Sequence, residues 1–246
     1  MARKIKLNGN LQVQVILTPG IIPLYDLDGK IAVVIDILRA TSSMCVALEN
    51  GAVEIMPVES VEEARSFKIG KFVCAAERDG EKVEGFDLGN SPFDYTEKVV
   101  KGKSVVMTTT NGTQAINLSR FAYRMVTGAF LNIDKLCEWL LVQDRDILLV
   151  CSGWKNKFNL EDTIFAGAVI SRIKHKFEVN DDAGIMAENL WDTAKDNLFG
   201  YVMKAAHAQR FERLGIERDV KFCLQLGTTD IIPEMVGNYL VKMKKF

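Results

Sequence analysis

The sequence has few of the residues on which several common kinds of active site depend. It contains only two histidines, His175 and His207, and each stands alone among basic or apolar neighbours. This scarcity argues against a zinc site built from several histidines and against a Ser-His-Asp triad. Any catalysis must therefore come mainly from carboxylates, hydroxyls, arginine and lysine.

The five cysteines are scattered singly, and no two of them form a CxxC pair. An odd number of isolated cysteines argues against a disulfide framework and against a thiolate zinc site. Cys151 stands at the end of an apolar run, where a nucleophile could act. Because it lacks a C-x5-R loop and a neighbouring histidine, we expect a buried structural thiol instead.

Charge of neither sign dominates the 246 residues, of which 31 are basic and 32 acidic. Neither sign gathers into long blocks, so the sequence lacks the pattern that binds nucleic acids or anionic membranes. No apolar run approaches the roughly 18 residues that a membrane-spanning helix needs. We therefore expect a cytoplasmic protein whose partner is a small molecule. The glycines and apolar helical patterns permit a homodimer without specifying one.

Apolar, β-branched runs alternate with helical patterns along the chain. The runs predict strands over residues 11–18, 31–38, 53–58, 71–77, 103–110, 124–130 and 146–153. The helical patterns cover residues 42–52, 60–70, 112–122, 132–143 and 160–174. Such alternation predicts an α/β fold with a mostly parallel or mixed sheet and helices on both faces.

No linker rich in proline, glycine or serine divides the chain, so we expect one α/β unit over residues 1–246. The alternative is a subdivision near residue 180, with an α/β core over 1–180 and a helix-rich part over 181–246. In that case the last segment is a helical appendage packed on the sheet, and it ends in a short tail interrupted by proline.

Polar or small residues follow several predicted strands at the point where a helix begins, and ligands of open α/β sheets bind at such places. In IAVVIDILRATSSM, Asp36 interrupts the apolar run, and Arg39, Thr41 and Ser42 follow. A cation, hydroxyls and a helix N-terminus are the components of an anion site. The alternative is structural, with Asp36 and Arg39 as an ion pair and a hydroxyl as the N-cap.

The run SVVMTTTNGTQAINL repeats this arrangement with hydroxyls, an amide and a glycine that lets a ligand approach the backbone. Its polar residues are Thr109, Thr110, Asn111, Gly112 and Thr113. The Walker lysine and the GxGxxG spacing are missing, which excludes a nucleoside triphosphate loop and a dinucleotide fingerprint. We favour anion binding over the alternative, a threonine-capped helix after an Asn-Gly turn.

A third strand end combines small residues with acids. Ser152 and Gly153 follow the apolar run, a basic loop comes next, and Glu161 and Asp162 open an apolar helix. Ser152 and Gly153 are candidates for contact with an anion. The two acids either complement the helix dipole or act as metal ligands or acid/base groups.

Two further acids stand beside apolar residues, Glu77 after a strand and Asp87 in the turn-dense stretch FDLGNSP. Two carboxylates about 4 Å apart repel by roughly 4 kcal/mol at an effective dielectric near 20. If Asp36, Glu77, Asp87 or Glu161 converge in pairs, a cation must lie between them. Mg²⁺ suits such a site because it commonly binds few carboxylates, several waters and a substrate phosphate. The expected metal ligands are Asp36, Glu77 and Asp87.

These segments, in this order, resemble the 2-phosphosulfolactate phosphatase family of coenzyme M biosynthesis. The resemblance rests on VVIDILRAT, ALENGA, AAERDGEKVEGFDLGNSP and TTTNGT, the segment around Ser152 and Asp162, and the tail from Asp219 to Pro233. It covers nearly the whole chain, and its combined motifs are far more specific than a single glycine motif. It implies a magnesium-dependent phosphatase that converts 2-phosphosulfolactate to sulfolactate and phosphate, with the family's own α/β fold.

The leading hypothesis is hydrolysis of a phosphorylated, sulfonated small anion, with Asp36, Arg39, Glu161 and Asp162 as catalytic residues. In it Mg²⁺ orients a water or nucleophile, Arg39 clamps the phosphoryl or sulfonate group, and residues 109–113 bind the other anion. Asp36 is either a metal ligand or a phosphorylated nucleophile. We favour the ligand because the second acid of a DxD arrangement is missing, with Leu38 in its place.

Two alternatives of other classes stay open. A Mg²⁺-dependent lyase or isomerase acting on a related acid would use much the same groups, but it would release no inorganic phosphate. A non-enzymatic protein that binds a small anion would have no need of the carboxylates.

Overall fold

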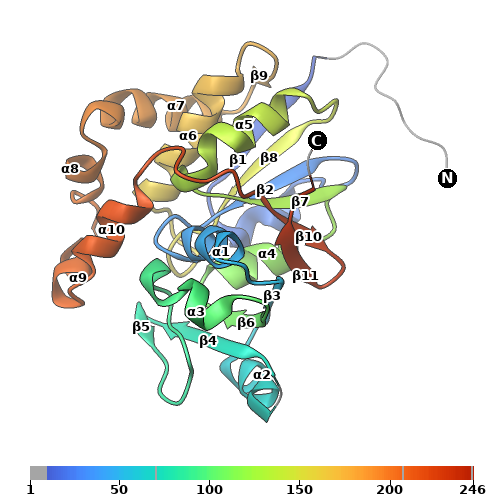
Figure 1. Cartoon of the computed structure of the whole chain (residues 1–246). Helices are drawn as coiled ribbons and strands as arrows, with labels where there is room; N and C mark the ends of the chain where they lie inside the picture. The colour runs from blue at the N-terminus through green and yellow to red at the C-terminus, as the bar shows by residue number, and fades with distance from the viewer. Residues whose placement is uncertain (1–9, 70, 207, 245) are drawn as a thin grey trace.

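The computed structural model describes residues 10–69, 71–206, 208–244 and 246. Gly70, which ends one predicted helix, and His207 lie outside the described residues, as do residues 1–9 and Lys245. Within the described part of the chain, eleven strands form one sheet, and helices lie against both of its sides (Figure 1). The predicted α/β class is confirmed.

Each of the strands predicted from apolar runs is present. They are β1 (Gln12–Ile16), β2 (Ile31–Ile35), β3 (Glu54–Pro57), β4 (Val73–Arg78), β6 (Ser104–Thr108), β7 (Arg124–Gly128) and β8 (Ile147–Cys151). Every residue of β2 and β8 is buried, which explains their continuous apolar sequence. The sequence missed β5 (Glu81–Lys82), β9 (Glu178–Val179), β10 (Pro233–Val236) and β11 (Tyr239–Lys242), because these strands are short and most of their residues are not buried.

The predicted helices are present as well. They are α1 (Ala40–Glu49), α2 (Val61–Ser66), α4 (Gly112–Ser119), α5 (Ile133–Leu141) and α6 (Leu160–Ile173). The remaining helices are α3 (Glu97–Val100), α7 (Asp182–Ala194), α8 (Leu198–Val202), α9 (Ala208–Arg213) and α10 (Glu217–Cys223). Three of the α-helices in the described part of the chain start at a side-chain cap, since Ser60 accepts a hydrogen bond from Glu63 N, Asp181 accepts one from Gly184 N and Asn197 accepts one from Gly200 N.

The sheet consists of two parallel sets of strands joined by an antiparallel hairpin, with β5 antiparallel to β4 at one edge. One set contains β4, β6 and β3, and the other contains β7, β2, β8, β1 and β9 in that order. Between the sets lie β10 and β11, which run antiparallel to each other and to their outer neighbours β7 and β3. The two parallel sets therefore run in opposite directions.

A flat sheet of this order would place the carboxyl ends of the two sets at opposite edges. The hairpin, however, joins each set through a single residue pair, Glu234 with Val126 and Leu240 with Ile55. Such short pairings leave the sheet free to twist strongly. Helices α1 and α4 lie between the strands of the two sets in Figure 1, and α4 contacts β2, β8 and β3.

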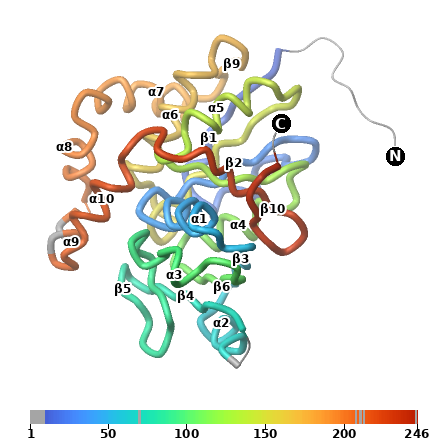
Figure 2. Tube along the Cα trace, in the orientation of Figure 1, coloured from blue at the N-terminus to red at the C-terminus, as the bar shows by residue number. Residues whose placement is uncertain are grey.

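The end of the chain differs from the helical appendage that the sequence suggested. Helix α7 packs on α6 and β1, but the tail crosses the molecule and forms the hairpin at the middle of the sheet (Figure 2). Pro233 did not prevent this, because it is the first residue of β10. The buried side chain of Asn132 fastens the tail by donating to Ile231 O at 2.9 Å.

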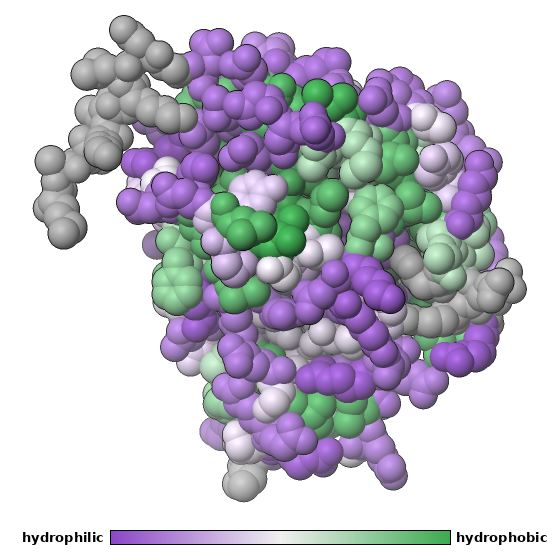
Figure 3. Space-filling model, turned by 180° about the vertical axis from the view of Figure 1, so that it is seen from behind, coloured by the Kyte–Doolittle hydropathy of each residue, from purple (hydrophilic) through white to green (hydrophobic). Residues whose placement is uncertain are grey.

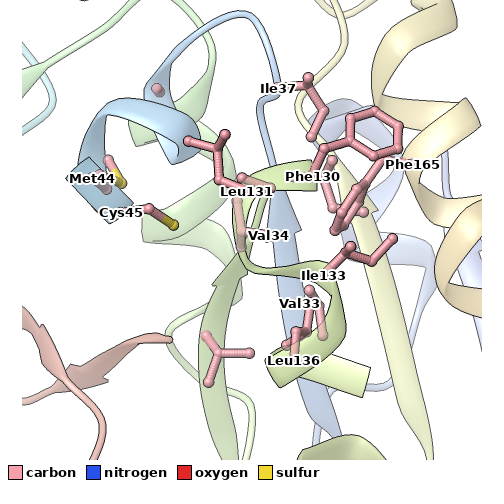
Figure 4. Close-up of a cluster of buried hydrophobic side chains, with 14 of the residues drawn as sticks. Val33, Val34, Ile37, Met44, Cys45, Phe130, Leu131, Ile133, Leu136 and Phe165 are labelled. Atoms are coloured by element: carbon pink, nitrogen blue, oxygen red, sulfur yellow. The ribbon is translucent and has the colours of Figure 1, made fainter. Parts of the chain in front are cut away.

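The main core lies directly behind the loop that follows β2. The rings of Phe130 and Phe165 meet edge to face with centroids 5.1 Å apart, and Ile37 lies beside them (Figure 4). Gly128 makes this packing possible, since a Cβ there would lie 2.7 Å from the Phe165 ring and 3.0 Å from Val33 Cγ1. The loop after β2 therefore rests on a rigid apolar base.

Polar side chains cover most of the rear face of the molecule, with hydrophobic patches between them (Figure 3). No helix in the described part of the chain is both long enough and apolar enough to cross a bilayer.

We predict that Gly167→Ala destabilises the protein. A Cβ on Gly167 would lie 1.9 Å from Ala187 O, so the backbones of α6 and α7 would have to separate. The loss should be about 3 kcal/mol or more, although alanine has the higher helix propensity. Gly20→Ala is the matched control, because its nearest contact would be an ordinary 3.5 Å. Equal midpoints of urea unfolding for the two variants would contradict this packing.

Candidate active site

The loops that follow β2 and β6 meet, although these strands belong to opposite halves of the sheet. A Cβ on Gly112, at the start of α4, would lie 2.6 Å from Asp36 Oδ2 and 2.9 Å from Ala40 Cβ. Only glycine permits so close an approach. The group that Gly112 accommodates is the carboxylate of Asp36, and binding of a ligand anion at Gly112 stays a prediction.

Asp36 is buried between the first residues of two helices. The backbone N–H of Ala40 donates to Oδ1 at 3.4 Å, and the N–H of Gly112 donates from the start of α4. Burial, together with the charges of Glu77 and then Glu161, nevertheless raises the pKa of Asp36 to about 7. The donors favour the charged form, but desolvation and the neighbouring acids outweigh them.

Glu77 joins the loop after β4 to the loop after β6. Its carboxylate accepts hydrogen bonds from Gly80 N at 2.6 Å, Thr110 N at 3.1 Å and Thr110 Oγ1 at 2.8 Å. The side chain is buried. The structure thus brings the predicted Glu77 and Thr110 together with Asp36.

Asp162 joins the loop after β2 to the loop after β8. It accepts from Ile37 N at 2.9 Å, Gly153 N at 3.1 Å and Asn159 Nδ2 at 2.9 Å. Burial and the charges of Glu161 and Asp36 raise its pKa well above the ordinary value despite these donors. Both carboxylate oxygens are engaged by the protein, so the contacts of Asp162 are those of a brace between loops.

Glu161 is 3% exposed and accepts a hydrogen bond from Asn159 Nδ2 at 3.1 Å. Its charge raises the pKa of both Asp36 and Asp162. Three acids predicted from separate parts of the sequence, Asp36, Glu77 and Glu161, are therefore electrostatically coupled in one buried cluster.

Arg39 forms its ion pair with Asp219 of α10, and its Nη2 donates to Gly80 O at 2.9 Å. The alternative of an ion pair between Asp36 and Arg39 is thus wrong for the described residues. Asp219 is 180 residues from Arg39 along the chain and is not among the site residues predicted from the sequence. The one local indication that Asp219 faces the interior is that it lies beside Val220 and Cys223, the other buried residues of α10.

Three hydroxyls of the predicted anion-binding loops bond to the backbone of their own loops. Thr41 Oγ1 donates to Asp36 O at 2.9 Å, Ser42 Oγ to Ile37 O at 3.0 Å, and Thr113 Oγ1 to Thr109 O at 3.0 Å. None of them is an N-cap in the described chain, because Arg39 and Asn111 occupy the N-cap positions of α1 and α4. These hydroxyls shape the loops.

The end of β8 provides a buried hydroxyl. Ser152 N donates to Ile35 O at 2.8 Å, which sets Ser152 beside the end of β2. Ser152 Oγ has no hydrogen-bond partner among the described residues. Cys151 is buried, and burial raises its pKa well above the ordinary thiol value, as expected of a structural cysteine.

Asp87 lies apart from this cluster. Its Oδ2 accepts from Cys74 N at 2.9 Å, and its Oδ1 is 3.6 Å from Lys68 Nζ. Cys74 is at the beginning of β4, about 10 Å along the strand from Glu77. The structure does not bring Asp87 together with the other acids, since it falls near the opposite end of β4.

The acid cluster fits an ion that needs few protein ligands. Within the described residues, no group of three or more His, Cys, Asp or Glu side chains is arranged to hold a metal, which disfavours a cage made wholly of protein side chains. Mg²⁺ is commonly bound by one or two carboxylates, with waters and substrate oxygens as further ligands. Asp36 with Glu77 or Glu161 would provide such a partial set, and the charges of both glutamates act on Asp36.

Comparison with known proteins identifies relatives along most of the chain. The family model described as 2-phosphosulpholactate phosphatase matches residues 16–238. The "Probable 2-phosphosulfolactate phosphatase" of Caldanaerobacter subterraneus subsp. tengcongensis is 39% identical over 85% of this chain and 89% of its own. Proteins of the same name from Thermotoga petrophila and Clostridium novyi are 39% and 37% identical, each over 91% of this chain and over 96% and 97% of their own. The chain belongs to the 2-phosphosulpholactate phosphatase family.

Proposed function

We propose that this protein uses Mg²⁺ to hydrolyse 2-phosphosulfolactate, or a similar phosphorylated 2-hydroxy acid, to sulfolactate and inorganic phosphate. The observation that carries the proposal is the buried cluster of Asp36 and Glu77, at the carboxyl ends of strands from both halves of the sheet, with Glu161 in the first turn of α6. The names of the relatives support the substrate, and the family supports the reaction class.

In this proposal Asp36, with Glu77 or Glu161, holds the metal ion. When bound, Mg²⁺ would offset the charge of the carboxylates and polarise the phosphoryl group. The N-termini of α1 and α4, which already face the Asp36 carboxylate through Ala40 and Gly112, would stabilise negative charge on the phosphoryl oxygens.

The other site residues position these groups. Asp162 holds the loops after β2 and β8 together, and Glu77 holds the loops after β4 and β6 together. Arg39 draws α10 onto the site through Asp219. The guanidinium of Arg39 already bonds to Asp219 and Gly80 O. We therefore propose that Arg39 holds the loops together, and not that it clamps the phosphoryl group as expected from the sequence.

The chemical role of Asp36 has two forms, metal ligand and phosphorylated nucleophile, and we propose the ligand. Its carboxylate lies at the meeting point of both halves of the sheet, where an ion can be shared with Glu77 or Glu161. Trapping of a covalent phosphate on Asp36 during turnover would assign it the nucleophilic role instead.

We predict that the protein releases inorganic phosphate from 2-phosphosulfolactate in the presence of Mg²⁺ and that EDTA abolishes the release. Phospholactate and phosphoglycolate serve as comparison substrates in the same colorimetric assay. Conversion of any of them without phosphate release would instead support the lyase or isomerase alternative. No release from any of the three would refute the phosphatase proposal.

We predict that Asp36→Asn and Asp87→Asn differ in their effect on kcat, because Asp36 belongs to the acid cluster and Asp87 lies apart from it. Loss of residues that merely orient metal ligands commonly costs 10- to 100-fold, so Asp36→Asn should lower kcat by at least about a hundredfold. Asp87→Asn should keep kcat within about twofold, because Asp87 contacts Cys74 N and Lys68 instead. Equal losses of kcat in the two variants would show that Asp87 belongs to the site.

We predict that the metal-free protein loses stability as the pH rises from 4 to 7. Folding raises the pKa of Asp36 from an ordinary 3.8 to about 7, so over this interval the folded state holds a proton that the unfolded state has released. The free energy of unfolding therefore falls with rising pH, by up to about 4 kcal/mol.

Urea unfolding at several pH values in EDTA measures this slope. Asp36→Asn should reduce this slope, leaving the part due to the raised pKa of Asp162, and should be more stable than the wild type at pH 8, because the amide never carries the charge. Mg²⁺ should restore wild-type stability at pH 8. A wild-type protein that becomes more stable between pH 4 and 7 would show that the Asp36 charge is already balanced within the fold.

A further inference from the structure

An exposed ion pair joins the turn after β4 to the loop after β8, next to the acid cluster. Lys155 Nζ lies 2.7 Å from Asp79 Oδ1, and the two side chains are 57% and 66% exposed. The ammonium also lies 5.4 Å from the ring centroid of Trp154. Ion pairs this exposed contribute little to stability, so the ammonium can exchange its partner at small cost.

Both residues of this pair bond to the loop that borders Asp36 and Glu77. Lys155 N donates to Asn111 Oδ1 at 2.9 Å, and Asn111 directly precedes Gly112. Asp79 N donates to Thr110 Oγ1 at 3.3 Å, and Thr110 in turn donates to Glu77. Asp79 is therefore linked to Glu77 through Thr110, and Lys155 is bonded to the residue that precedes Gly112.

The backbone on both sides of the pair is in an uncommon conformation. The φ angles are +54° at Asp79, +49° at Lys155 and +57° at Asn156, in a region that residues other than glycine rarely adopt. Such conformations persist where the surroundings impose them, and they gather at sites that hold ligands.

The arginines near the acids are already engaged by the protein. Arg39 bonds to Asp219 and to Gly80 O, and Arg78 bonds to Glu77 O and to Thr108 Oγ1. Lys155 differs from these arginines, because its protein partner is exposed and readily exchanged. A substrate with several negative charges therefore meets an exchangeable ammonium at this rim.

We propose that Lys155 leaves Asp79 and binds the sulfonate of the substrate, which makes it a specificity-determining residue. This inference rests on the proposed function. The reacting phosphoryl group must face the acid cluster and its metal ion, so a group on the neighbouring carbon reaches toward the loops. A sulfonate keeps its charge at every physiological pH, and its three oxygens match the three N–H donors of an ammonium.

The test compares two substrates that differ in the sulfonate alone, 2-phosphosulfolactate and phospholactate. Lys155→Gln should raise KM for 2-phosphosulfolactate by about tenfold or more, as loss of a charge-assisted hydrogen bond does, and should keep kcat within about twofold. KM for phospholactate should stay unchanged. Lys157→Gln is the matched control on the same loop, where the Lys157 backbone pairs with Trp154, and it should alter neither substrate.

Asp79→Asn distinguishes sulfonate binding from a strap between loops. Asparagine tolerates the positive φ at position 79. Because the variant removes the carboxylate that competes with the sulfonate for Lys155, it should lower KM for 2-phosphosulfolactate. Sulfonate recognition by Lys155 is refuted by an equal rise in KM for both substrates, by no rise for either, or by an Asp79→Asn variant that behaves like Lys155→Gln.

A wild-type protein that releases no phosphate would refute the proposed function, and Lys155 would then be judged by binding alone. Calorimetric titration with sulfolactate and with lactate provides that readout. Weaker binding of sulfolactate by Lys155→Gln, with lactate binding unaltered, would uphold the sulfonate contact. Identical affinities of wild type and variant for sulfolactate would overturn it.

Discussion

The burial of several carboxylates at one place is the constraint on which the rest of this structure depends. Asp36, Glu77, Glu161 and Asp162 are each less than a tenth exposed, and burial together with the neighbouring carboxylate charges raises the pKa of Asp36 and of Asp162. The surrounding features reduce this cost. Backbone donors surround Asp162 and Glu77, two helix N-termini face Asp36, and Gly112 leaves room for its carboxylate. In the proposed function, a Mg²⁺ ion would balance the remaining negative charge.

A cluster of this kind needs a rigid support, and the twisted sheet with its central hairpin provides one. The two parallel sets run in opposite directions and are joined by β10 and β11, which lets the carboxyl ends of strands from both sets approach each other. Arg124 Nε binds Glu234 at 2.7 Å and so fixes the hairpin to β7. The core around Phe130 and Phe165 supports the loop that carries Asp36. This apolar packing offsets the free energy that burial of the carboxylates costs.

Most of the secondary structure and much of the candidate site could be predicted from the sequence. Strands such as β2 and β8 are buried on both faces, so their apolar runs are continuous. Asp36 and Glu77 stand out because each breaks such a run at its carboxyl end. The hairpin escaped prediction because β10 and β11 are short and partly exposed, and the strands on either side of it, β7 and β3, lie more than a hundred residues away along the chain.

The sequence by itself determined the α/β alternation, the polar residues at the strand ends and the scarcity of histidine that leaves chemistry to carboxylates. Only the tertiary structure decided that Arg39 pairs with Asp219, that Asp87 lies apart from the cluster and that Lys155 meets Asp79. The physical reason is that periodicity and burial are properties of short segments, which a local pattern records. The partners of a charged side chain depend instead on which strands become neighbours and how strongly the sheet twists, and both are set by contacts across the whole chain.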